Sequence, residues 1–247
     1  MSGRRKALEQ ALAGYGLHLR GGFVPAASDA LPGLPGGAAA AVLWLVGQVG
    51  SACWPAFSGS AFFRDGLPDP MDRWSQAIGD TLAQQHGGVA LYPSDGPPYW
   101  PFQRWAERAE ALQPTPLGLR IHPQWGLWHA YRFALLLPAA DAEDTASLEA
   151  APEAGYAPGL EAGPEAAFAT EICARCVAQL CLHACPVDAY GPAGYDVAAC
   201  AGHLRGPDGA PCMQGGCLAR RACPVGSGLR YLPEHAAFHM RAYLRRR

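Results

Sequence analysis

The chain has few of the features that mark membrane, secreted and nucleic-acid-binding proteins. Only 16% of its 247 residues are charged, and its single lysine is Lys6. The most apolar run, at residues 36–50, is too short to span a bilayer, and the N-terminus lacks the continuous apolar segment of a signal peptide. The net charge of −2 gives no general reason to expect binding to nucleic acid. We therefore expect a cytoplasmic protein with neither a membrane nor a nucleic-acid partner.

Cysteine is almost absent from the first two thirds of the chain. Only Cys53 precedes residue 173, whereas eight cysteines follow between residues 173 and 223. The reducing cytoplasm disfavours structural disulfides, so clustered cysteines in such a protein point to metal binding or catalysis. Cys53 is interpreted as a buried apolar residue.

The eight clustered cysteines form two runs that each end in a Cys-Pro pair. The first run has the spacing C-x2-C-x4-C-x3-C-P, and the second places one cysteine well upstream of C-x4-C-x5-C-P. Eight thiolates match two 4Fe–4S clusters, and in two-cluster ferredoxins the Cys-Pro cysteine of each run binds the other run's cluster. Two four-cysteine zinc sites are the alternative, although only one C-x2-C pair is present. The candidate metal ligands are Cys173, Cys176, Cys181, Cys185, Cys200, Cys212, Cys217 and Cys223.

Apolar periodicity predicts an α+β domain ahead of the cysteines. The predicted helices cover residues 4–19, 71–88 and 102–113, and the predicted strands cover residues 40–47, 88–93 and 129–138. Residues 139–170 are rich in Ala, Pro and acidic side chains, which is the composition of a linker. We therefore predict a mixed-sheet domain at residues 1–138, this linker, and a cysteine-rich domain at residues 171–247.

Two features outside the cysteine runs have more than one interpretation. Arg132 lies in an apolar strand, so its guanidinium should have a partner, either a core carboxylate or an anionic ligand group. The arginine-rich end, HMRAYLRRR, is interpreted as a helix end whose charges complement the helix dipole. The alternative is a docking patch for an acidic electron donor.

The order of the cysteines resembles the C-terminal half of epoxyqueuosine reductase, a cobalamin-dependent enzyme. In that family an isolated cysteine between the two runs is a cluster ligand, and Cys200 in the segment YDVAAC matches it. The resemblance implies a crossed assignment of the ligands. One cluster would be held by Cys173, Cys176, Cys181 and Cys223, and the other by Cys185, Cys200, Cys212 and Cys217.

The segment IHPQWGLWHAYRFALLLP, residues 121–138, resembles the signature of the cobalamin-processing CblC family. That signature reads His-Pro-x-aromatic-Gly-x-Trp-aromatic-Ala-aliphatic-Arg-Gly before an apolar strand, and Phe133 stands here in place of the last glycine. The likeness covers roughly residues 39–138. It implies a nitroreductase-like α+β fold and a corrinoid pocket that contains His122, Trp128, Tyr131 and Arg132.

Taken together, the two resemblances imply an iron–sulfur oxidoreductase that acts on or with cobalamin. A ferredoxin-like module with two clusters would reduce the cobalt of a corrinoid in the nitroreductase-like domain, or remove its upper ligand reductively. Reduced ferredoxin, flavodoxin or a flavin reductase would supply the electrons. The alternatives are a ferredoxin-like carrier that serves a partner enzyme without a corrinoid, and an enzyme that reduces epoxyqueuosine.

Overall fold

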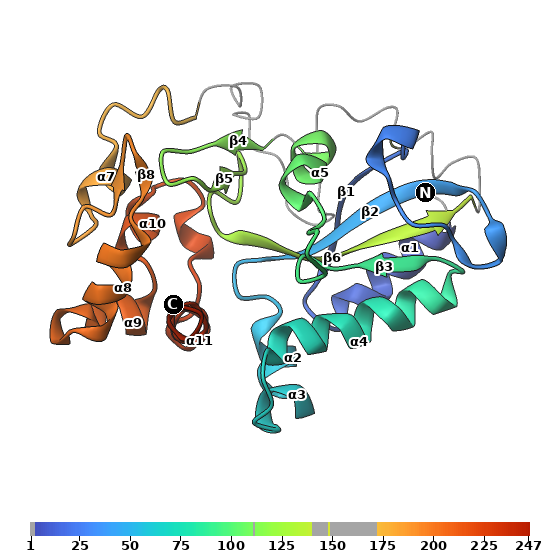
Figure 1. Cartoon of the computed structure of the whole chain (residues 1–247), viewed down its shortest axis with the longest axis horizontal. Coiled ribbons are helices and arrows are strands. Elements are labelled where there is room, and N and C mark those ends of the chain that lie inside the picture. Colours follow the sequence, from blue (N-terminus) through green and yellow to red (C-terminus); the bar gives the residue numbers. More distant parts are fainter. Residues whose placement is uncertain (1–2, 111, 140–147, 149–171) are drawn as a thin grey trace. The chain divides into compact units, whose positions relative to one another are not determined.

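The protein is a mixed α/β protein whose chain divides into two compact units (Figure 1). The computed structural model describes residues 3–110, 112–139, 148 and 172–247. Unit 1 comprises Met1–Ala111 and Ala130–Glu161, and unit 2 comprises Leu112–His129 and Ala162–Arg247. The sequence predicts domain limits at residues 138 and 171, whereas the structure groups Leu112–His129 with the cysteines. Apart from residues 139 and 148, the predicted linker lies outside the described residues.

Unit 1 is built on a four-stranded sheet in the order β1-β2-β6-β3. The strands are β1 (His18–Phe23), β2 (Ala40–Val49), β3 (Val89–Leu91) and β6 (His129–Pro138). β1 pairs antiparallel with β2, and β3 pairs antiparallel with β6. The three predicted strands are confirmed as β2, β3 and β6. The coarse part of the predicted α+β class is confirmed, because the structure combines helices with a sheet that contains antiparallel strand pairs.

Strand β1 is the strand that apolar periodicity does not reveal. Its sequence, HLRGGF, contains two glycines and two polar residues, which are unfavourable inside strands. The glycines allow α5 (Phe102–Ala109) and β2 to approach closely. A Cβ on Gly21 would lie 2.1 Å from the carbonyl oxygen of Ala109, and one on Gly22 would lie 2.6 Å from the Trp44 ring.

The helices of unit 1 confirm the helical periodicity of the sequence. They are α1 (Gly3–Ala13), α2 (Trp54–Ser58), α3 (Ala61–Arg64), α4 (Pro70–Gln85) and α5, with 3-10 turns η1 (Ala27–Asp29) and η2 (Pro35–Gly37). The apolar face predicted for α4 is confirmed, since Trp74, Ile78 and Leu82 are buried. α1 and α5 are shorter than predicted. α5 stops because Glu110 has extended backbone angles and its carboxylate is buried.

The core of unit 1 is formed by the two long strands. Phe133–Leu137 of β6 are completely inaccessible to solvent, and Val42–Val46 of β2 are buried as well. Consecutive buried residues mean that helices cover both faces of these strands. Burying one such aliphatic side chain contributes about 1.5–3 kcal/mol. Cys53 is also completely buried, which confirms its interpretation as a core residue.

A buried ion pair joins β1, the end of α5 and β6. Arg20 Nε donates to Glu110 Oε1 at 2.7 Å, and the arginine also donates to the second carboxylate oxygen. The Tyr131 hydroxyl donates to the same carboxylate at 2.5 Å. Burial alone would raise the pKa of Glu110, but the charge of Arg20 and these hydrogen bonds lower it to about 2. The network therefore ties the edge strand β1 to the centre of the sheet.

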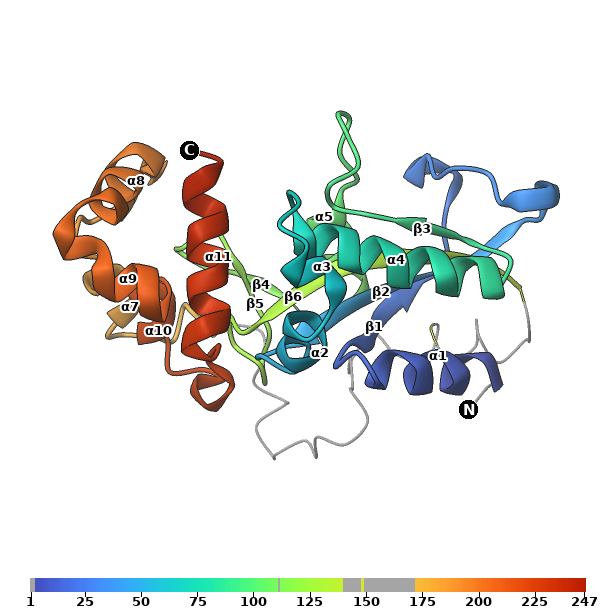
Figure 2. The same cartoon turned by 90° about the horizontal axis from the view of Figure 1, so that it is seen from below.

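Unit 2 consists of short helices and two-residue strands. The strands are β4 (Gln113–Pro114), β5 (Arg120–Ile121), β7 (Tyr190–Gly191) and β8 (Gly194–Tyr195). The helices are α7 (Leu180–His183), α8 (Val197–Arg205), α9 (Ala210–Gly215), α10 (Leu218–Ala222) and α11 (Pro233–Arg245), with 3-10 turns η4 (Pro207–Gly209) and η5 (Ser227–Leu229). α11 packs along α9, and α10 packs on α7 (Figure 2). The helix predicted at the arginine-rich end is confirmed as α11. No helix among the described residues is both long and apolar enough to cross a bilayer.

Replacing Glu110 with Gln tests the buried network. Removing the carboxylate leaves the Arg20 charge without its main counter-ion, so the free energy of unfolding of unit 1 should fall by about 3–5 kcal/mol at neutral pH. The folded-state pKa of Glu110, about 2, lies below the ordinary value of 4.5. The wild type should therefore lose the carboxylate's contribution as the pH falls from about 4.5 toward 2, and Glu110→Gln should lack that part of the acid sensitivity.

Denaturant unfolding, with hydrogen exchange of the β1 and β2 amides as the readout for unit 1, measures both effects. Asp65→Asn is the control, because its ion pair with Arg73 lies at the surface, with side chains 30% and 27% exposed. We expect only a small change in that variant. Equal losses in the two variants, or unchanged acid sensitivity in Glu110→Gln, would contradict a structural role for the network.

Candidate metal centre

Four cysteines from distant parts of the sequence come together in unit 2. Cys173 and Cys176 lie in the turns before α7, Cys181 lies within α7, and Cys223 directly follows α10. Because α7 packs on α10, Cys223 joins the first three although four other cysteines separate it from Cys181 in the chain. We refer to these four residues as the first cysteine set.

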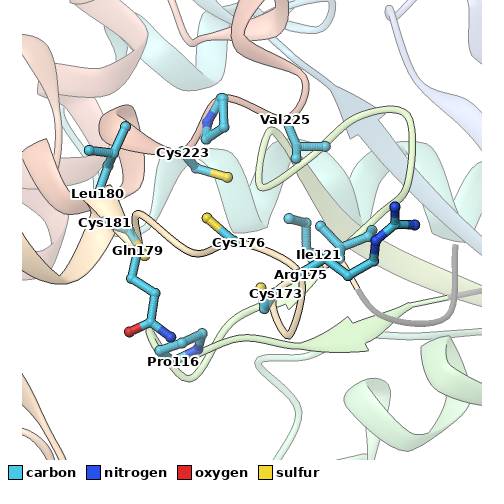
Figure 3. A pocket seen from close by; sticks show the side chains of 12 residues that line it. Pro116, Ile121, Cys173, Arg175, Cys176, Gln179, Leu180, Cys181, Cys223 and Val225 are labelled. Carbon is cyan, nitrogen blue, oxygen red and sulfur yellow. The ribbon is translucent and has the colours of Figure 1, made fainter. Parts of the chain in front are cut away.

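The first cysteine set lines a cavity of about 240 Å³ (Figure 3). The side chains of Cys176 and Cys223 point toward one another across it. The rest of the wall is mainly apolar and consists of Pro116, Ile121, Ile172, Leu180, Pro224 and Val225, with Arg175 and Gln179 as its polar members. A water molecule occupies about 30 Å³ in the liquid. The cavity therefore has room for a group of several atoms beside the four sulfurs.

The other four cysteines of unit 2 form a second group, which we refer to as the second cysteine set: Cys185, Cys200, Cys212 and Cys217. Burial raises the pKa of Cys212, a hydrogen bond from the backbone of Leu218 lowers it, and the charges of the other three thiolates raise it again, so the four thiols interact electrostatically. The hydroxyl of Tyr190 lies 3.7 Å from the sulfur of Cys217, within hydrogen-bonding range. The sulfur of Cys185 accepts a hydrogen bond from the backbone N–H of Ala189 at 3.3 Å.

The thiols of the first set also interact electrostatically with one another. Burial raises the pKa of Cys173, and the charges of Cys223, Cys181 and Cys176 raise it further. In the protein alone, therefore, deprotonation of one thiol opposes deprotonation of the next. Iron cations bound to the sulfurs would remove this repulsion, because thiolate ligands are stabilised by the metal that they bind. Four thiols around a mainly apolar cavity thus suit an iron–sulfur cluster in their chemistry.

A zinc site and an iron–sulfur cluster make different demands on four cysteines. Within the described part of the chain, no group of three or more His, Cys, Asp or Glu side chains is placed to hold one ion. In a mononuclear zinc site four ligands contact the same ion. In a four-iron cluster each thiolate binds a different iron, so the sulfurs lie farther apart. Cluster binding by the eight cysteines stays a prediction.

Both cysteine sets pack against one apolar cluster in unit 2. Its buried centre is formed by Leu117, Ile121, Leu127 and Ala219. The cysteines in contact with it are Cys173, Cys181 and Cys223 of the first set and Cys185 and Cys217 of the second. The two sets are therefore neighbours within one compact unit.

The segment Ile121–Trp128, the first part of the CblC-like motif, is part of this packing. Gly126 has a φ of +57°, and a Cβ at this position would lie 1.9 Å from the carbonyl oxygen of Val225, two residues after Cys223. Arg220 Nε donates to the carbonyl oxygen of Leu127 at 3.0 Å. The backbone of the motif thus lies directly on the loop that follows the last cysteine.

His122 and Trp128, two predicted corrinoid contacts, have structural contacts within unit 2. His122 Nδ1 accepts hydrogen bonds from the backbone N–H groups of Gln124 and Trp125, at 3.1 and 3.3 Å. Its ring stacks on Trp125 with 3.8 Å between ring centres. Trp128 is only 3% exposed and packs edge-on against Tyr231. A corrinoid contact for either residue stays a prediction.

Tyr131 and Arg132, the other two predicted contacts, belong to unit 1. Tyr131 is part of the network around Glu110. The buried Nε of Arg132 has no hydrogen-bond acceptor among the described residues, and the partner expected for its guanidinium stays a prediction. Burial raises the pKa of the nearby Cys53 thiol to about 11, although the charge of Arg132 opposes this shift. Cys53 donates to Gln48 Oε1 at 2.9 Å. Arg132 therefore has a donor that a ligand oxygen could satisfy.

Two tyrosines beside the second set were not singled out by the sequence. Tyr190 and Tyr195 lie opposite each other in the β7–β8 hairpin, and their rings stack with 4.8 Å between centres. Tyr195 is also a neighbour of the Cys200 thiol. The signal was the pattern YGPAGY, in which two aromatic residues flank a Gly-Pro-Ala-Gly turn and so favour a hairpin.

Comparisons with known proteins add no assignment. No protein-family model matches the chain, and a comparison with curated proteins finds no match. The likeness to CblC and to epoxyqueuosine reductase therefore rests on the motif residues alone.

Replacing the two Cys-Pro cysteines separately tests the crossed grouping. Cys223→Ser should remove the metal centre of the first set, although Cys223 lies in the second run of the sequence, because its sulfur shares the cavity with Cys176. Cys185→Ser should instead damage the centre of the second set. Iron content together with the electron paramagnetic resonance (EPR) spectrum of the reduced protein measures which centre is lost.

Cys53→Ala is the matched control, since this buried cysteine belongs to unit 1 and should leave the iron content unchanged. If each Cys-Pro variant lost only the centre of its own sequence run, the two runs would be independent sites and the crossed grouping would be wrong.

Proposed function

We propose that the protein binds two 4Fe–4S clusters and transfers electrons one at a time. The observation that carries this proposal is the cavity that Cys223 shares with Cys173, Cys176 and Cys181. Two groups of four thiolates are the ligand set that two such clusters need, and a crossed Cys-Pro ligand is the arrangement of two-cluster ferredoxins. The first cysteine set would hold one cluster and the second set the other.

Bound clusters would supply one-electron chemistry at low potential. The chain itself contributes enclosure and hydrogen bonds. The apolar cluster around Ile121 and Leu127 keeps water from the sides of both cysteine sets that contact it. Tyr190 and the amide of Ala189 contact sulfurs of the second set. Hydrogen bonds to sulfur and exclusion of water are the means by which a protein sets the potential of such a centre.

For the electron acceptor we propose a corrinoid held by unit 1, as the CblC resemblance implies. The support from the structure is the buried Nε of Arg132, which has no acceptor among the described residues. An unpaired buried donor costs about 1–3 kcal/mol, so a ligand oxygen at this point would stabilise the site. On this proposal unit 1 is a nitroreductase-like domain and unit 2 a ferredoxin-like module of a cytoplasmic protein. The reaction is cobalt reduction or reductive removal of the upper ligand.

A carrier without a corrinoid is the second candidate, and one observation favours it. His122 and Trp128 take part in the packing of unit 2 itself, so the presence of these two residues does not require a ligand. In that case unit 1 would dock a partner enzyme. Epoxyqueuosine reduction is a third candidate that rests on the order of the cysteines. For each of them the proposed donor is reduced ferredoxin, flavodoxin or a flavin reductase.

Metal analysis of protein purified without oxygen tests the first part of the proposal. We expect about eight irons and eight sulfides per chain, because eight thiolates serve two cubane clusters. The brown protein should lose visible absorbance on reduction with dithionite. Stoichiometric zinc without iron or sulfide would overturn the proposal.

Arg132→Gln tests the corrinoid acceptor. Losing one charged hydrogen-bonding group typically costs about 1.5–3 kcal/mol, so the affinity for cobalamin should fall roughly ten- to a hundredfold. Iron content should stay intact, because all eight clustered cysteines lie in unit 2. Spectral titration with cobalamin under anaerobic conditions gives the affinity.

Arg104→Gln, at an exposed position of α5 in the same unit, is the matched control and should bind cobalamin as the wild type does. No spectral change with the wild type would refute the corrinoid and leave the carrier as the function. Earlier melting of Arg132→Gln with unchanged cobalamin affinity would show that Arg132 is a structural residue.

A further inference from the structure

The C-terminal end of α11 presents a compact basic surface. Arg241 and Arg245 are exposed in the last two turns of α11, and the exposed Arg246 and Arg247 follow directly after its end. The described residues of unit 2 contain ten arginines against four acidic side chains, which are Asp188, Asp196, Asp208 and Glu234. Positive charge therefore dominates this unit. We refer to the four exposed arginines as the α11 arginine patch.

Three tyrosines connect the α11 arginine patch with the second cysteine set. Tyr243, which lies within the patch on α11, accepts a hydrogen bond from Tyr195 at 2.8 Å between the hydroxyl oxygens. Tyr195 stacks on Tyr190, whose hydroxyl lies 3.7 Å from the sulfur of Cys217. Tyr195 is itself a neighbour of the Cys200 thiol. A chain of ring and hydrogen-bond contacts thus runs from two ligand sulfurs to the arginines at the surface.

The first cysteine set has different surroundings, and the charged side chain in its cavity wall is Arg175. That set lies in a mainly apolar cavity and against the apolar cluster of Leu127 and Ile121. The second set is the one that the three tyrosines connect to the α11 arginine patch. Its partner at that face should have a complementary, negative charge.

We propose that the α11 arginine patch is the docking site of an acidic one-electron carrier protein, which delivers electrons to the second cysteine set. This inference rests on the proposed function and adds to it the face at which the donor binds and the centre that is reduced first. In each encounter the reduced carrier loses one electron and the second centre gains it, with no proton or group transferred. Opposite charges steer such encounters and weaken them as salt is added.

An RNA or DNA strand is the other class of partner that arginines attract. The observations favour the protein carrier for two reasons. The patch is confined to one helix end, whereas binding along a phosphate backbone needs a longer basic track. The contacts through Tyr243 also lead to ligand sulfurs, which serves electron transfer and has no use in holding phosphate.

The test measures binding separately from electron transfer. The probes are a strongly acidic 2Fe–2S ferredoxin and an acidic flavodoxin, and the variant is Arg241→Glu/Arg245→Glu in the full chain. We expect the Kd for the carrier to rise about tenfold in the variant, and the wild-type Kd to rise steeply between about 50 and 300 mM NaCl. The rate of cluster reduction by the carrier should fall in parallel, while bleaching by dithionite stays complete.

Arg104→Glu makes the same change of charge at an exposed position of unit 1 and is the matched control. A carrier Kd that is equal in all three proteins, or insensitive to salt, would overturn the docking site. Tighter binding of a single-stranded oligonucleotide than of either carrier, lost in the double variant, would overturn it in favour of nucleic acid. Failure of the proposed function would be distinguishable from this result. Dithionite would then cause no loss of visible absorbance in the wild type, whatever the value of the carrier's Kd.

Discussion

The contact between two glycine turns is the constraint on which the arrangement of unit 2 depends. A Cβ on Gly126 would lie 1.9 Å from the carbonyl oxygen of Val225, and a Cβ on Gly226 would lie 2.4 Å from the backbone of Trp125. Both glycines have positive φ, near +60°, so neither position readily accepts another residue. Because the two backbones meet without side chains between them, the loop that begins at Cys223 is held against the CblC-like segment. This contact brings Cys223 to the cavity of the first cysteine set.

The same contact explains why a segment from the middle of the sequence belongs to the cysteine unit. Leu112–His129 contributes Ile121 and Leu127 to the apolar cluster that both cysteine sets contact. Immediately afterwards the chain forms β6, which carries Arg132 and the buried run of unit 1. The chain thus passes from unit 2 into unit 1 between His129 and Ala130, ahead of the acidic stretch that the sequence suggests as the boundary.

The sequence alone predicts those helices and strands whose formation depends mainly on which residues are buried. β2, β6 and α4 were predicted because their apolar runs and helical spacing report directly which faces are buried. β1 could not be predicted, since its glycines satisfy the close approach of α5, which is a tertiary requirement. The ion pair of Arg20 and Glu110 joins residues far apart in the chain, and each charge looks like an ordinary surface residue until the fold is known. The grouping of Cys223 with the first run was implied by the resemblance, and the cavity agrees with it.

Anomalous diffraction at the iron absorption edge, from crystals grown without oxygen, is the most direct test of the central claim that the two cysteine sets are two iron–sulfur sites. The account predicts two separate peaks, one in the cavity between Cys176 and Cys223 and one among Cys185, Cys200, Cys212 and Cys217. Each peak should have the strength of several irons, because each site holds a four-iron cluster. A signal at the zinc edge instead, or a single iron peak bound by cysteines from both sets, would contradict the account.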